Sequence, residues 1–103
     1  MSQPKQPADP PTVITKRAEH YRDCYANSVQ VRMSVWDFFL VFGTMHQASP
    51  EEVTIENFQG IYLSPQQAKA LLNVLSHNLA QYEQTFGPLA LEPHFVPPGG
   101  PVH

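Results

Sequence analysis

The sequence lacks most of the features that would commit it to a particular chemistry. It holds one cysteine, Cys24, so no disulfide can form within the chain and no CxxC pair can hold zinc. No glycine-rich phosphate loop occurs, because the Gly99-Gly100 pair lies in a proline-rich tail. No apolar run approaches the ~20 residues that a membrane-spanning helix needs. The lone cysteine and the absence of an apolar N-terminal run predict a cytoplasmic protein with no membrane partner.

Charge is also scarce and gives little encouragement to a nucleic-acid partner. Charged residues make up 15% of the chain and the net charge is -3. The one local cluster of basic and aromatic residues surrounds Tyr21 and Tyr25, and its cations are Lys16, Arg17, Arg22 and Arg32. Such a cluster can stack bases and contact phosphates, which makes nucleic acid an alternative partner. A solvated basic segment is the favoured interpretation, because the whole chain is acidic.

For each residue that could take part in catalysis, we favour an ordinary structural role. Cys24 lies near His20 and Asp23, so a thiolate supported by histidine is one hypothesis, but an inert thiol beside a strand is favoured. The five histidines show no ligand spacing such as an i, i+4 pair. Asp37 is expected to cap a turn rather than to react. We therefore predict no enzyme activity, no metal and no cofactor.

Proline divides the chain. Nine of its eleven prolines fall near the two ends, which predicts extended tails over residues 1–20 and 88–103 around a domain over residues 21–87. A chain of this size buries only about 60% of its unfolded surface, so a small core leaves it marginally stable. With disulfides excluded, oligomerisation is the expected source of additional stability.

The first half of the domain shows the patterns of strands. Apolar and polar residues alternate over Tyr25–Val35, which predicts a strand, and Ser34–Asp37 has the residues of a tight turn. Phe38–Met45 is apolar at every second position on both faces and predicts a strand covered on both sides. Residues 46–52 are expected to form a connection. Val53–Leu63 predicts a third strand or a strand pair, with a bulge or turn over residues 57–60.

The clearest element is a helix over residues 64–87. Ser64 is expected to be its N-cap, with Pro65 at the first position and Gln67 completing a capping box, and Gly87-Pro88 to end it. Apolar residues recur at alternating steps of four and three, a seam formed by Ala68, Leu72, Leu75, Leu79, Tyr82 and Phe86. Leu71 and Val74 widen it beyond the ~100° stripe that packing on one core requires.

These elements predict an α+β protein, an antiparallel sheet of three to four strands followed by one long C-terminal amphipathic helix. The second strand, apolar on both faces, and the broad apolar face of the helix carry more apolar surface than a monomer of this size can bury, which predicts a homodimer or larger oligomer. The residues expected at an oligomer or partner interface are Phe39, Val41, Leu71, Leu72, Val74, Leu75, Leu79 and Tyr82.

Four sequence blocks give the chain a family resemblance. The blocks are Tyr25-x-Asn27-x-x-x-Val31, Ser34-x-x-Asp37-Phe38-x-Leu40-x-Phe42-Gly43, Leu63-Ser64-Pro65-x-x-Ala68-Lys69-x-Leu71-Leu72 and Tyr82-Glu83-x-x-Phe86-Gly87. Together they resemble a family of small bacterial proteins of about a hundred residues, known as a domain of unknown function. The resemblance implies a small bacterial single-domain protein and brings no activity with it.

Two functions remain open at the level of sequence. The favoured one is a homo-oligomeric protein-binding or adaptor module, of which a holdase-like chaperone is one version by fold-level analogy. The alternative is a nucleic-acid-associated protein that uses residues 16–32.

Overall fold

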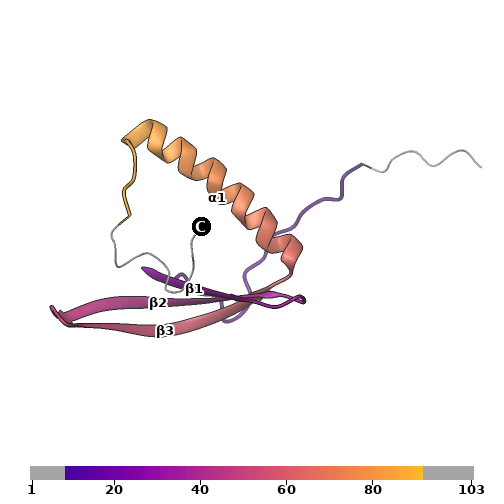
Figure 1. The fold of residues 1–103 in the computed structure, drawn as a ribbon. Coiled ribbons are helices and arrows are strands. Elements are labelled where there is room, and N and C mark those ends of the chain that lie inside the picture. Colours follow the sequence, from indigo (N-terminus) through magenta and orange to yellow (C-terminus); the bar gives the residue numbers. More distant parts are fainter. Residues whose placement is uncertain (1–8, 92–103) are drawn as a thin grey trace, which may run out of the picture.

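The computed structural model describes residues 9–91 and contains one antiparallel sheet and one helix (Figure 1). The sheet has the order β1-β2-β3, formed by β1 (Ser28–Met33), β2 (Phe38–Ser49) and β3 (Glu52–Leu63), and α1 (Pro65–Phe86) follows. The predicted α+β architecture is therefore confirmed, with three strands in the described part of the chain. Residues 9–27 and 87–91 contain no helix or strand, and residues 1–8 and 92–103 of the predicted tails lie outside the described residues.

β1 is shorter than the predicted strand because side chains replace the ladder at its beginning. The Asn27 side chain binds the backbone of Met45: its Oδ1 accepts from the Met45 N–H at 2.6 Å, and its Nδ2 donates to the Met45 carbonyl at 3.4 Å. The Asn27 N–H also donates to the Gly43 carbonyl at 3.1 Å. The Asn27 side chain thus makes the two hydrogen bonds to the Met45 backbone that a longer β1 would make, and Tyr25 lies outside the sheet.

The predicted turn between β1 and β2 is confirmed, and a serine fixes it. The Ser34 hydroxyl oxygen accepts from the backbone N–H groups of Trp36 at 3.0 Å and Asp37 at 3.2 Å. The Ser34 N–H donates to the Asp37 carbonyl at 2.9 Å. Asp37 therefore serves the turn, and Trp36 stands at its tip with 81% of its surface exposed.

β2 and β3 form a long two-stranded arm, and the sequence pattern did not predict its far end. The predicted connection over residues 46–52 is wrong, because β2 continues to Ser49 and only Pro50 and Glu51 join it to β3. Polar residues can extend a strand where neither face is covered, so hydrophobic alternation gives no signal there. The choice between a third strand and a strand pair is also settled, since β3 is one strand with a bulge at Phe58.

Two glycines make close approaches possible within the sheet. A Cβ on Gly43 would lie 2.6 Å from the Glu56 carbonyl oxygen, beside the bulge. A Cβ on Gly60 would lie 2.7 Å from the Phe39 ring, which covers that glycine. The same ring stacks on Tyr62 with a centroid distance of 4.3 Å. An aromatic side chain laid over a glycine in this way stabilises a strand that has little side-chain packing of its own.

α1 begins at the predicted cap and ends at the predicted glycine, but the predicted capping box is only half formed, because the described hydrogen bonds include none from the Ser64 N–H to the Gln67 side chain. The Ser64 hydroxyl oxygen accepts from the Gln67 N–H at 3.1 Å, and Pro65 is the first helical residue. At the other end Gly87 has φ = +107°, a region that disfavours side chains, and its N–H donates to the Glu83 carbonyl at 2.9 Å. Local signals therefore define both ends of the helix.

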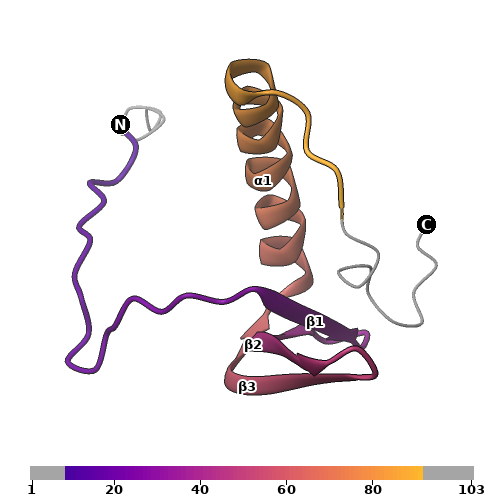
Figure 2. The same ribbon diagram turned by 90° about the vertical axis from the view of Figure 1, so that its left-hand side faces the viewer.

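The packing of helix against sheet is slight. In both views α1 leaves the end of β3 and rises away from the sheet, so that its second half stands apart (Figures 1 and 2). No α1 residue is buried, and Leu40 is the one buried apolar side chain in the described chain. Most helical stability in proteins comes from packing of an apolar face, so this helix lacks its usual support within one chain.

Candidate interaction surfaces

The first candidate surface is the apolar face of α1, which we call the helix stripe. It consists of Ala68, Leu71, Leu72, Val74, Leu75, Leu79, Tyr82 and Phe86. Only Ala68 and Leu71, near the sheet, are half-buried. Leu75 and Leu79 are 50% and 49% exposed, and the Tyr82 and Phe86 rings contact each other at 4.9 Å. The stripe holds every helix residue predicted for an interface, and all of them remain accessible.

The sheet is apolar on both faces, but the prediction that its second strand is covered on both sides is not met within the described chain, because α1 touches the sheet only at the end of β3 (Figure 1). Residues paired across an antiparallel ladder share a face, so the register separates the two sides. The Leu40 face holds Val29, Val31, Met33, Phe38, Leu40, Phe42, Ile61 and Leu63. The Phe39 face holds Phe39, Val41, Met45, Val53, Ile55 and Tyr62. The predicted interface residues Phe39 and Val41 are half-buried, and neither face is fully covered.

A hollow of about 930 Å³ lies between the Leu40 face and the segment that precedes β1. Its apolar floor is formed by Phe42, Phe58 and Ile61. The preceding segment contributes the remaining polar and aromatic wall, formed by His20, Tyr21, Arg22, Cys24 and Tyr25. Sequence reasoning missed this hollow, because it depends on where an irregular segment crosses the sheet.

Contacts within that segment join three of its titratable side chains, Arg17, Tyr21 and Asp23. The Tyr21 hydroxyl donates to the Asp23 carboxylate, and this hydrogen bond raises the pKa of Tyr21 above 10.0. The Arg17 guanidinium lies 4.9 Å from the centroid of the Tyr21 ring. Cys24 is exposed and lines the hollow with His20, but no hydrogen bond joins them among the described residues. The arrangement therefore gives no support to a nucleophilic thiol.

The four cations predicted as a nucleic-acid contact do not share one surface. Arg17 lies on Tyr21, and Arg22 lines the hollow beside the Leu40 face. Arg32 is opposite Phe39 in the ladder and therefore lies on the other face of the sheet. Lys16 is exposed on the segment before β1. A groove that follows a phosphate backbone needs its cations on one side, which this arrangement does not offer.

Comparison with known proteins places the chain in a family. The model of a family described as "Protein of unknown function (DUF3467)" matches residues 1–91, a span that includes the whole sheet and the whole helix. The chain belongs to this family. No curated protein and no solved structure matches it. The family resemblance seen in the sequence is thus confirmed, and DUF3467 membership leaves the activity open.

Metal-ligand clusters and membrane-spanning helices are absent from the described part of the DUF3467 chain. Within residues 9–91, no three His, Cys, Asp or Glu side chains gather as metal ligands. In the same range, the helix is not apolar enough to cross a membrane. The surfaces with a distinct chemical character are therefore the apolar ones.

Proposed function

We propose that this DUF3467 chain is a homo-oligomeric protein-binding module in which a second copy covers the helix stripe. The observation that carries the proposal is a 22-residue helix with a broad apolar stripe and no buried residue. A helix in a protein draws most of its stability from the packing of its apolar face. Its stripe therefore needs a cover that the described chain does not supply.

A second copy is the occupant that best fits the stripe. Its 4-3-4-3-4 spacing is the pattern with which one helix packs against another, with side chains inserted between those of the facing helix. Lys69 and Glu83 are the only charges of α1, and neither is one of the stripe residues; Glu83 flanks the stripe, where its carboxylate accepts from the Leu89 N–H at 2.9 Å. A two-fold axis presents the same patch on both copies, which suits one continuous uncharged face.

The contact with other proteins is proposed to lie at the β1–β2 turn. Val35 and Trp36 are both 81% exposed at its tip, on backbone that the Ser34 hydrogen bonds hold in place. Tryptophan is enriched among the residues that dominate binding energy at protein interfaces. A preformed turn loses little conformational freedom on binding. The holdase-like version of this function would use the same tip to hold unfolded clients.

The oligomer is tested by light scattering coupled to size exclusion. We expect a mass of two or more times the 11.6 kDa of one chain. A mass equal to one chain at every concentration up to the millimolar range would overturn the proposal. The measurement uses the full chain, so that both tails are present.

Client binding is tested with Trp36 as both probe and target, because it is the only tryptophan. We expect its emission to shift to shorter wavelength on adding reduced, aggregating insulin, and light scattering by the insulin to fall. Trp36→Ala should abolish that suppression. Val13→Ala, a change at a side chain of similar exposure (84%), should retain it. Equal suppression by both variants would show that the turn is not the contact.

A further inference from the structure

The outer edge of β3 is a long strand edge that no strand within residues 9–91 pairs with. β3 has 12 residues, and its sequence contains no lysine, arginine or proline. The other edge of the sheet, β1, has six residues and carries Arg32. Proteins protect sheet edges with short strands, charged side chains (lysine above all), proline or β-bulges, since an open edge recruits further strands. β1 is short and carries a cation, whereas β3 has neither lysine nor proline; its charges are Glu52 and Glu56, and its one bulge at Phe58 leaves a regular stretch on either side.

The hydrogen bonds of β2 reveal which β3 groups point to this edge. Met45 directs its backbone groups to the Asn27 side chain, on the β1 side of β2. Its neighbours Thr44 and His46 therefore direct theirs to β3, where Glu56 and Thr54 are their partners. The residues that alternate with those partners direct their N–H and C=O groups to the free edge; they are Val53, Ile55 and Asn57.

The same reasoning applies on the other side of the bulge. The Ser34 N–H donates to the Asp37 carbonyl, so the backbone groups of Asp37 are directed to the β1 side. Those of the next residue, Phe38, are therefore directed to β3. Leu63 and Ile61 use their backbone groups on β2, and the alternate residues Tyr62 and Gly60 present theirs at the free edge. All five outward residues lie on the Phe39 face of the sheet.

The bulge at Phe58 decides how β3 can pair with itself. In a regular strand, residues on one face are an even number apart, and an antiparallel partner must match face with face. The extra residue at the bulge shifts the spacing by one, so Val53 and Tyr62 share a face although their positions differ by nine, an odd number. Full overlap of the strand in a two-fold pair, with Glu52 opposite the partner's Leu63, therefore matches both faces.

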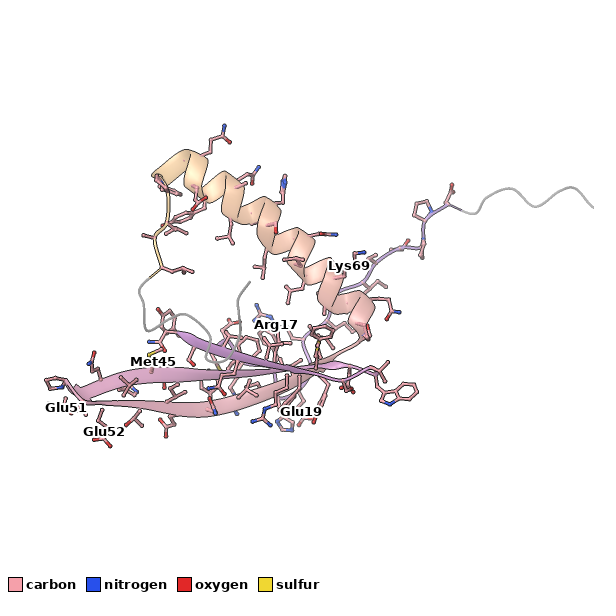
Figure 3. All side chains as sticks on the ribbon, viewed as in Figure 1. Arg17, Glu19, Met45, Glu51, Glu52 and Lys69 are labelled. Atoms are coloured by element: carbon pink, nitrogen blue, oxygen red, sulfur yellow. The ribbon has the colours of Figure 1, made fainter. Side chains whose placement is uncertain are left out.

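Charge at the ends of β3 favours the same antiparallel arrangement. Figure 3 shows Glu51 and Glu52 at one end of the sheet and Lys69, on α1, at the other. The first turn of α1 contains no acidic residue, so its positive dipole end has no negative side chain of its own. Antiparallel pairing brings the acidic end of one copy to the helix start and Lys69 of the other.

We propose that two copies join through their β3 edges, antiparallel about a two-fold axis, to form one six-stranded sheet. Val53 then pairs with the partner's Tyr62, and Ile55 with the partner's Gly60, through backbone hydrogen bonds. On the other face Glu56 meets the partner's Gln59, so no two like charges face each other. This inference rests on the proposed function, because it names the strand through which the oligomer assembles.

Engineered disulfides test the register. In a Cys24→Ser background, Val53→Cys/Tyr62→Cys should form a covalent dimer on mild oxidation, because paired strand residues have the Cα separation of a disulfide. Residues 53 and 62 lie far apart along one strand, so the bond cannot form within a chain. The matched control is Val53→Cys/Ile61→Cys, whose cysteines lie on opposite faces and should stay monomeric on a non-reducing gel.

Each outcome is decisive when light scattering is measured on the same samples. A covalent dimer from the first pair alone supports the proposal. An oligomer that neither pair cross-links, or that both pairs cross-link equally, overturns the β3 pairing and leaves the proposed function standing. A monomer overturns both.

A charge reversal gives an independent test that leaves the outward-pointing residues of β3 unchanged. Lys69→Glu should weaken the dimer about fivefold at low salt, since exposed ion pairs contribute modestly. Glu51→Lys/Glu52→Lys in the same chain should restore the affinity. Failure of the second change to restore it, with circular dichroism unchanged, would refute the antiparallel arrangement.

Discussion

Leu79→Asp is the substitution that most directly separates a covered helix stripe from an exposed one. Leu79 lies in the middle of the stripe and is 49% exposed in the single chain. If the stripe stayed in water, the change would cost about 0.5 kcal/mol in helix propensity and roughly 1 kcal/mol in lost partial burial. The sheet would not be affected, because Leu79 belongs to the second half of α1 (Pro65–Phe86), the half that stands apart from the sheet (Figure 1).

A second copy over the stripe changes the magnitude. Truncating a buried leucine costs about 2–5 kcal/mol, and an unpaired carboxylate in an apolar contact adds a further penalty. A central estimate of about 4 kcal/mol for one substitution corresponds to roughly a thousandfold weaker association. Two-fold symmetry places the change on both copies, which increases the loss further.

The assay is light scattering over a concentration series, with circular dichroism at each point. We expect Leu79→Asp to shift the mass to one chain and to lose helical signal, since an uncovered helix is marginal. Gln81→Asp is the matched control, because it adds the same charge on the amide-rich back of α1. Wild-type mass and helicity in Leu79→Asp would refute the reasoning.

Three further substitutions test the fold by urea unfolding. Gly60→Ala should destabilise the protein by about 1–3 kcal/mol, because its Cβ would meet the Phe39 ring at 2.7 Å, and Phe39→Ala in the same chain should relieve that clash. Asn27→Ala should cost about 1–2 kcal/mol through its lost hydrogen bonds to the β2 backbone, and a loss below 0.3 kcal/mol would contradict that role. Ser64→Ala should cost about 1 kcal/mol by removing the N-cap, whereas Ser76→Ala within the helix should have almost no effect.

The sequence predicted the elements whose limits are set by local chemistry. The Ser64 hydroxyl and the left-handed Gly87 act on backbone groups within a few residues, so reading along the chain is sufficient. The same holds for Ser34, whose hydroxyl accepts hydrogen bonds from the N–H groups two and three residues further on and so closes the β1–β2 turn. Short-range hydrogen bonds of this kind are specified by residue type and spacing.

Features that depend on which strands pair were beyond the sequence pattern. The polar end of β2 gives no alternation, so the sequence pattern predicts a connection where the strand continues over residues 46–49. The bulge could be placed only within residues 57–60, since its position is set by register with Gly43. The candidate surfaces divide in the same way: heptad spacing predicted the helix stripe, but nothing local indicated the hollow or the open β3 edge.

The order of the strands connects the two proposals. Because β3 lies at one edge, pairing through it leaves β1 and the turn that carries Trp36 on the outside of each copy. The two-fold axis then presents two such turns on one dimer, so a partner with two binding segments gains from linked binding. Pairing through β1 would instead place the turn beside the new interface and restrict access to its tip. The dimer that best satisfies the β3 edge is thus also the one that keeps Trp36 accessible for a partner.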